Sequence, residues 1–127
     1  MTTLLLVAIG GAGGALMRFG LGLLASNLLF PWGTLIINIA GCLAIGLCWS
    51  AFAHTEWFAA WGRALIVVGL LGGFTTFSAF SLETLQLVQN ARLAAAASYV
   101  VASVLLCLLA TFIGLRLGGS LGSGQSF

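Results

Sequence analysis

The stretch GGFTTFSAF, residues 72–80, lies in the middle of an apolar run from Leu65 to Val88. Adjacent glycines and adjacent threonines are poor helix formers, because glycine is conformationally loose and threonine competes for backbone hydrogen bonds with its own hydroxyl. An interrupted helix leaves backbone groups without intrahelical partners, and inside a membrane these are tolerated only where protein, water or an ion satisfies them. The stretch therefore predicts a broken membrane helix, and the break is a candidate functional site.

The whole chain has the composition of an integral membrane protein. Of its 127 residues, 61% are hydrophobic and 5% are charged, whereas about 25% are charged in a typical soluble domain. Four apolar stretches are long enough to cross a hydrocarbon core about 30 Å thick, at residues 3–24, 33–52, 65–88 and 94–115. We expect an all-α membrane domain over residues 1–117, with its third helix broken from Gly72 to Thr76, and a flexible tail over residues 118–127.

The remaining composition excludes several function classes. The formal net charge is +2, without the basic cluster that nucleic acid would favour. One histidine and two acidic residues form no paired nucleophile and base, so the sequence predicts no enzyme. Cys42, Cys48 and Cys107 fall inside predicted spans at no metal-ligand spacing, and we expect them to pack as small apolar residues.

Two polar side chains in the first two spans are candidate functional residues. Arg18 follows Gly10 and Gly14 at intervals of four, so it shares a face of small residues that must point at protein. It either snorkels to the lipid headgroups or attracts an anion, and the shared face favours the second alternative. The amide of Asn38 needs a partner in hydrocarbon, so it either joins helices together or lines a polar pathway.

Aromatic and hydroxyl side chains mark the last two spans. Phe77, Phe80 and Ser81 share one face beyond the break, where the phenylalanines either pack in a core or serve a site. Tyr99 and Ser103 are four residues apart and give the fourth span a mildly polar stripe.

The arginines predict how the chain inserts. With four spans, Arg63 and Arg116 lie on the side of the two termini, and Arg18 and Arg92 lie on the opposite side. Orientation is normally set by an excess of Lys and Arg on the cytoplasmic side, so a tie predicts insertion both ways. Two oppositely inserted copies can pair about a two-fold axis in the membrane plane, which brings their breaks together. The sequence therefore predicts an antiparallel, dual-topology homodimer.

Recognisable motifs occur in all four predicted spans. They are GAGGALMR at residues 11–18, WGTLIINIAG at residues 32–41, GGFTTFSAFSLE at residues 72–83, and Tyr99 with Ser103. Together they resemble the Fluc (CrcB) fluoride channel family. The resemblance implies a multi-pass protein of the bacterial inner membrane, forming dual-topology dimers with two antiparallel fluoride pathways and a central sodium ion that is not transported.

The resemblance also implies roles for particular residues. The backbone carbonyls of Gly72 and Thr75 would hold the structural sodium ion. The fluoride pathway would be lined by Asn38, Phe77 and Phe80, with polar contacts from Ser81, Tyr99 and Ser103. To this pathway we add Arg18, as the anion attractor inferred from its place on the glycine face. Ala79 stands where the family usually has threonine, and Cys107 stands where a hydroxyl is often found, so the track of hydroxyls departs from the family pattern.

The function implied is a passive channel that lets toxic cytoplasmic fluoride leave the cell. Fluoride holds its water tightly, so a selective path must offer amide hydrogens, hydroxyls and the positively polarised edges of aromatic rings. An inside-negative potential drives an anion outward by about 2.3 kcal/mol per 100 mV.

Two alternatives remain at this point. A small dual-topology, proton-coupled multidrug transporter needs a membrane-embedded carboxylate, for which Glu83 is a weak candidate. Glu83 lies late in the third span, where an interfacial carboxylate needs no special role. A structural subunit without transport would show no ion flux when purified.

Overall fold

The computed structural model describes residues 1–24 and 29–121, and within these ranges the regular structure is entirely helical. Its elements, in chain order, are α1 (Thr2–Leu24), α2 (Trp32–Phe52), η1 (Phe58–Leu71), α3 (Gly72–Phe74), α4 (Phe77–Gln89) and α5 (Leu93–Leu121). Four spans in this part of the chain are long and apolar enough to cross a membrane, and η1, α3 and α4 together form the third. The prediction of an all-α, multi-pass membrane protein is therefore confirmed.

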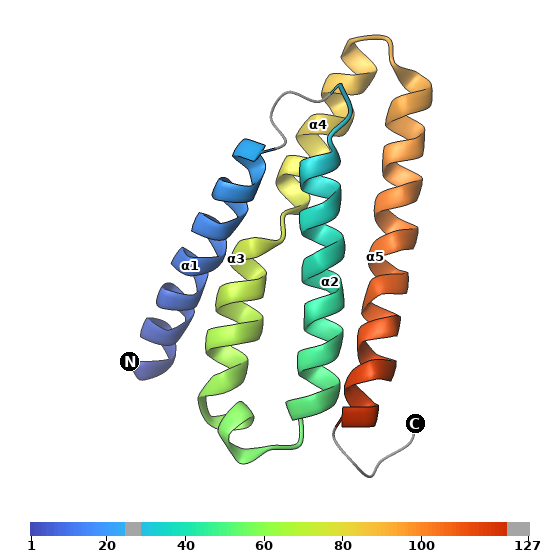
Figure 1. Cartoon of the computed structure of the whole chain (residues 1–127). Coiled ribbons are helices and arrows are strands. Elements are labelled where there is room, and N and C mark those ends of the chain that lie inside the picture. Colours follow the sequence, from blue (N-terminus) through green and yellow to red (C-terminus); the bar gives the residue numbers. More distant parts are fainter. Residues whose placement is uncertain (25–28, 122–127) are drawn as a thin grey trace.

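The spans run alternately up and down, so that α1 begins and α5 ends at the same end of the molecule (Figure 1). Helix α1 leans away on one side of the bundle, α5 lies on the other side, and α2 lies between them. The half of the third span before the break, η1 and α3, packs mainly against α1, whereas α4 packs mainly against α5. The third span thus changes neighbours at its break.

The third and fourth spans extend beyond their predicted bounds. The third begins at Phe58 and not at Leu65, because Phe58 is 2% exposed and its ring packs edge-on against those of Trp49 and Trp57. Helix α5 continues to Leu121, so the first four residues of the predicted tail are helical, and residues 122–127 lie outside the described ranges. A Cβ added at Gly118 would lie 2.9 Å from the Cβ of Ser50, so this end of α5 packs closely on α2.

The break is shorter than predicted. Gly72 and Gly73 are helical, and the interruption consists of Thr75 and Thr76, whose ψ angles of 157° and 118° are those of extended chain. Threonine is β-branched and adopts extended backbone readily. The glycine at position 73 serves packing instead, because an added Cβ would lie 2.5 Å from the carbonyl oxygen of Gly11 in α1.

The predicted glycine face of α1 packs against protein over most of its length. A Cβ at Gly10 would lie 2.9 Å from the backbone nitrogen of Leu70, and one at Gly14 would lie 2.7 Å from that of Phe74. By contrast, a Cβ at Gly22 would meet nothing within 4 Å among the described residues. The close approach of α1 to the third span therefore ends near Arg18.

The apolar core of the protein lies on the far side of the break. It contains buried side chains from α2, α4 and α5, namely Leu35, Phe80, Leu87, Ala96 and Tyr99. Tyr99 is fully buried, and its ring centroid lies 5.2 Å from that of Phe80. This core fixes α4 and with it the side chains that follow the break.

Candidate functional site

Asn38 of α2 holds the break through two hydrogen bonds. Its Nδ2 donates to the carbonyl of Thr76 at 3.0 Å, and its Oδ1 accepts from the N–H of Thr76 at 2.8 Å. Both backbone groups of an extended residue at membrane depth are thereby paired, as a low-dielectric environment requires. Of the two alternatives for Asn38, the structure shows a side chain that joins α2 to the third span.

Two further contacts fix the ends of the two half-helices. The Nε of Arg18 donates to the carbonyl of Gly73 at 3.1 Å, so the arginine points at the break. On the other side, the Oγ1 of Thr76 accepts from the N–H of Ala79 at 3.1 Å and caps α4. Threonine is a favoured N-cap residue for this reason. The second threonine of the break therefore starts the next helix.

Because of these contacts, two backbone carbonyls lose the N–H donors that they would have in a continuous helix. In a continuous helix, the Gly72 carbonyl would accept from the N–H of Thr76, and the Thr75 carbonyl would accept from the N–H of Ala79. Both N–H groups donate elsewhere, to Asn38 and to the Thr76 hydroxyl. The carbonyls released from helical bonding are the pair predicted to hold a cation, and their neutral oxygens suit a monovalent hard ion. No group of three or more His, Cys, Asp or Glu is placed to hold a metal among the described residues.

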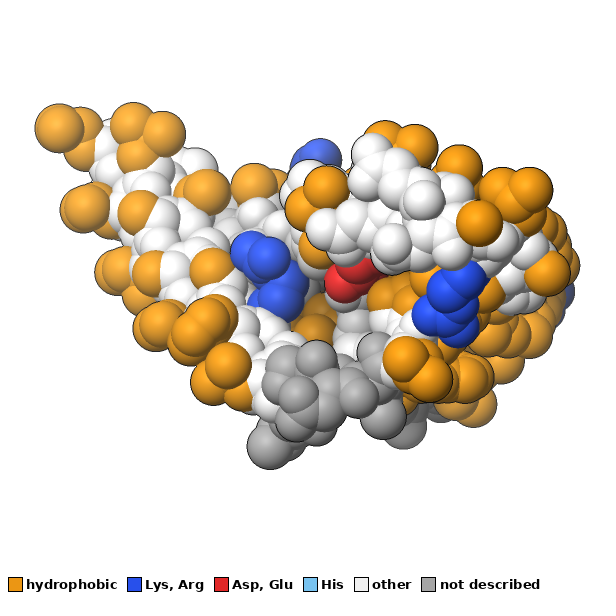
Figure 2. Space-filling model, turned by 90° about the horizontal axis from the view of Figure 1, so that it is seen from above, with side chains coloured by type: hydrophobic (Ala, Val, Ile, Leu, Met, Phe, Trp, Pro, Cys, Tyr) orange, Lys and Arg blue, Asp and Glu red, His pale blue; other side chains and the backbone are white. Residues whose placement is uncertain are grey.

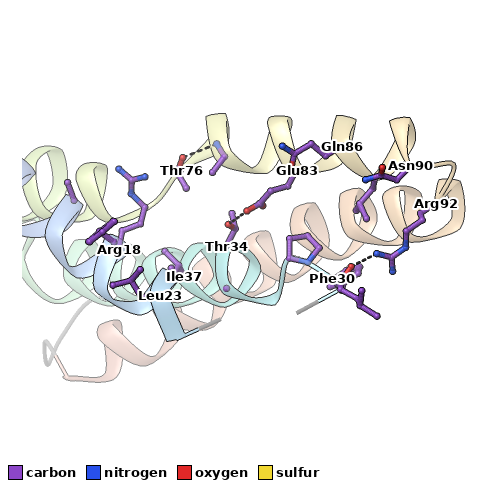
Figure 3. Close-up of a pocket in the computed structure, with 18 residues that line it drawn as sticks. Arg18, Leu23, Phe30, Thr34, Ile37, Thr76, Glu83, Gln86, Asn90 and Arg92 are labelled. Atoms are coloured by element: carbon purple, nitrogen blue, oxygen red, sulfur yellow. Dashed lines mark hydrogen bonds between the residues drawn. The ribbon is translucent and has the colours of Figure 1, made fainter. Parts of the chain in front are cut away.

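A polar hollow opens between α1, α2 and α4, toward the end of the molecule where the chain turns from α4 into α5 (Figure 1). Its volume is about 660 Å³, and its lining includes Arg18, Thr34, Thr76, Glu83 and Arg92. Viewed from this end, acidic surface is recessed between basic side chains, with hydrophobic side chains around the outside (Figure 2). Figure 3 shows Arg18 toward one end of the polar hollow and Arg92 toward the other, with Glu83 between them. The hollow therefore holds two arginines and one carboxylate, a positive balance, with Arg18 nearest the break.

Glu83 was underestimated from the sequence. Its carboxylate accepts a hydrogen bond from Thr34 Oγ1 at 2.7 Å and another from the hydroxyl of Tyr99 at 2.6 Å. The carboxylate therefore joins α4 to α2 and α5, and the expectation that it needs no special role is wrong. Glu83 follows Phe80 by three residues, so it shares the inward face of α4, and this spacing could have indicated the contact.

A second hollow, which we call the apolar groove, runs along α2, the break and α5. Its volume is about 420 Å³, and its lining includes Asn38, Gly72, Thr75, Phe77, Phe80 and Ser103. The ring centroids of Phe77 and Phe80 lie 5.2 Å apart, although Phe77 is 77% exposed and Phe80 only 8%. Within the described part of the chain, the buried hydroxyl of Ser103 has no hydrogen-bond partner. The groove therefore presents aromatic rings and one free hydroxyl.

The predicted site residues divide between these two hollows. Arg18 lines the polar hollow, and Thr76 lines both, so the hollows meet at the break. Ser81 and Tyr99 line neither hollow. The Ser81 hydroxyl donates to the carbonyl of Phe77 in its own helix, and the Tyr99 hydroxyl donates to Glu83. The structure thus brings together most of the predicted set but places Ser81 and Tyr99 outside both linings.

Comparison with known proteins places this arrangement in context. Residues 5–115 match the family described as "CrcB-like protein, Camphor Resistance (CrcB)". A relative from Paracoccus denitrificans, named a fluoride-specific ion channel, is 47% identical over 124 residues that cover 94% of this chain and 96% of the relative. One of the same name from Thermus thermophilus is 44% identical over 95% of this chain and 98% of the relative. The resemblance found in the sequence is therefore confirmed.

Proposed function

This chain belongs to the CrcB-like family, and from that membership and the two hollows we propose that it forms a passive, fluoride-selective channel. Relatives that align over almost the whole chain are named fluoride-specific ion channels. In such a channel the chain would let cytoplasmic fluoride leave the cell, driven by the membrane potential without a coupled reaction.

The apolar groove carries the proposal, because its lining matches the needs of a small, strongly hydrated anion. The unpartnered Ser103 hydroxyl can donate a hydrogen bond, and the rings of Phe77 and Phe80 can offer their positively polarised edges. Such groups replace water around the ion without adding a fixed positive charge that would trap it. A binding site that released fluoride slowly would not serve conduction.

The polar hollow fits the approach to this groove. The guanidinium of Arg18 lines the hollow and bonds to the carbonyl of Gly73, so its charge is held beside the break. A fixed positive charge in a recess raises the local concentration of anions. Fluoride would therefore gather in the polar hollow and pass Thr76, which lines both hollows, into the apolar groove.

We further propose that two copies pair in opposite orientations, with their apolar grooves facing the interface. Phe77 is 77% exposed in the single chain, and Gly72, which lines the same groove, is exposed as well. A second copy placed over this face would cover both residues and give each chain's groove a second wall. The sequence predicts two arginines on each side of the membrane, and this balance favours insertion in both orientations.

The released carbonyls of Gly72 and Thr75 fit a structural sodium ion at this interface. Two carbonyls from each copy would supply four neutral oxygen ligands, which suit an alkali ion better than calcium or magnesium. When bound, the ion would supply positive charge that holds the two breaks together. Exchange of sodium for a bulky organic cation is then expected to lower both dimer stability and fluoride efflux, and the proposal fails for sodium if neither falls.

Fluoride efflux from liposomes that contain only this protein tests the function. We expect efflux that needs no proton gradient and that follows the membrane potential set by potassium and valinomycin. Chloride efflux under the same conditions is the control and should stay at the level of empty liposomes. Efflux of organic cations coupled to protons would instead favour the multidrug transporter, with Glu83 as its carboxylate, and the absence of any flux would favour a structural subunit.

A further inference from the structure

Two of the three cysteines lie side by side in the apolar groove, although the sequence separates them by 65 residues. Cys42 on α2 and Cys107 on α5 both line the groove, and the two thiols are near enough to interact electrostatically. Both side chains are half-buried and neither forms a disulfide. The expectation that all three cysteines serve as small apolar packing residues therefore overlooked this contact.

Close packing of the two helices explains why these thiols meet. One turn beyond Cys42, a Cβ added at Gly46 would lie 2.9 Å from the backbone nitrogen of Leu115. From the other side, a Cβ at Gly114 would lie 2.8 Å from the backbone nitrogen of Leu47. The backbones of α2 and α5 therefore nearly touch one turn beyond Cys42 and about two turns beyond Cys107, so the two cysteines lie on helices in close contact.

We propose that Cys42 and Cys107 form a two-thiol binding site for a soft metal ion such as mercury(II), silver(I) or copper(I), inside the apolar groove. Thiolates prefer soft ions, and such ions accept two sulfur ligands. Binding of mercury(II) forms two Hg–S bonds and releases the two thiol protons to water, so that no oxidant or reductant is needed. The ion would lie in the same groove as Ser103 and Phe80 and would obstruct it.

The third cysteine supplies a matched control. Cys48 is also a half-buried free thiol on α2, but it does not line the apolar groove. A variant with Cys48→Ser keeps the proposed pair, whereas Cys42→Ser and Cys107→Ser each leave a single thiol in the groove. Serine is close in size to cysteine, so all three variants change the packing of the helices very little.

Mercury binding to the purified full chain, in competition with a soluble monothiol, tests the site directly. We expect the parent and Cys48→Ser to bind one ion tightly per chain, and Cys42→Ser and Cys107→Ser to bind at least about 100-fold more weakly, because a chelating pair gains that much over one thiol. Equal binding by all four proteins, or loss of binding in Cys48→Ser alone, would overturn the proposal.

Alkylation of the parent protein adds a measurement that needs no variant. With mercury(II) bound, mass spectrometry should find Cys42 and Cys107 protected from a thiol reagent and Cys48 labelled as before. Protection of Cys48 alone, or of none of the three, would contradict the pairing even if a variant failed to fold.

Obstruction of the groove rests on the proposed function, whereas metal binding does not. In liposomes, mercury(II) should stop fluoride efflux by the parent and by Cys48→Ser but not by the other two variants, and a small dithiol should restore it. If the chain binds mercury as described but shows no fluoride efflux at all, the channel function fails and the thiol site stands. If fluoride efflux is present but mercury binding is the same with and without Cys42 and Cys107, only the thiol site fails.

Discussion

The two halves of the third span are held in different ways. Before the break, Gly73 approaches the backbone of Gly11 in α1 so closely that a Cβ has no room. After the break, α4 is held by side chains, through Phe80 packed on Tyr99 and through Glu83 bonded to Thr34 and Tyr99. Lipid tails are as apolar as leucine, so helices in a membrane gain little from burying apolar surface alone. Backbone proximity holds one half, ring packing and hydrogen bonds hold the other, and Asn38 ties the break between them to α2.

The largest effect is expected on the half held by backbone contact. Gly73→Ala places a Cβ 2.5 Å from the carbonyl oxygen of Gly11, and neither backbone can yield cheaply. We expect a loss of about 3 kcal/mol of stability, seen as a lower midpoint of thermal unfolding in detergent. Gly20→Ala is the control, since an added Cβ there meets no described atom within 4 Å. Equal midpoints for the two variants would show that α1 does not clamp the break.

The junction between the halves is expected to be the next most sensitive. Asn38→Ala removes both partners of the Thr76 backbone, at a cost of about 2 kcal/mol, and should also slow fluoride efflux. Thr84→Ala serves as the control, because its hydroxyl bonds to the Phe80 carbonyl within its own helix. Unchanged stability would contradict the role of Asn38 as the link, and unchanged efflux with lowered stability would remove it from the pathway.

The two phenylalanines should separate packing from conduction. Phe80→Ile opens space in the core and is expected to cost about 1.5 kcal/mol, whereas Phe77→Ile, at an exposed position, should change the stability of the single chain by less than about 0.5 kcal/mol. Both variants should slow fluoride efflux, because each loses a polarised ring edge. Leu82→Ala, at a side chain 60% exposed, controls for a change elsewhere on α4. If fluoride efflux falls only in the variant that also loses stability, both rings serve packing and not conduction.

The smallest effect is expected at the hydrogen bonds behind the polar hollow. Tyr99→Phe keeps the ring against Phe80 and removes one bond to Glu83, so we expect a loss of about 1 kcal/mol. Ser98→Ala is the neighbouring control, since its hydroxyl bonds to the carbonyl of Ala95 on its own helix. A Tyr99→Phe protein as stable as Ser98→Ala would mean that α4 is held by ring packing without help from Glu83.

Much of this protein follows from its sequence by itself. Apolar length and the low charge predict four membrane spans, and the motif GGFTTFSAF predicts an interruption in the third. These features depend on local composition, which a single span already contains. The same motif also predicted a break beginning at Gly72, but both glycines are helical, and Gly73 supplies the close approach to Gly11 of α1. Propensity alone could not separate these two uses of glycine.

Only the tertiary structure decided which side chains meet. The bonds from Asn38 to Thr76, from Arg18 to Gly73, and from Thr34 and Tyr99 to Glu83 each join different helices. The meeting of Cys42 and Cys107 depends in the same way on how closely α2 approaches α5. Helical spacing fixes which residues share a face, but the rotation and approach of one helix against another are set by packing between spans. For that reason the two hollows, and the residues that each receives, could be assigned only once the helices were in place.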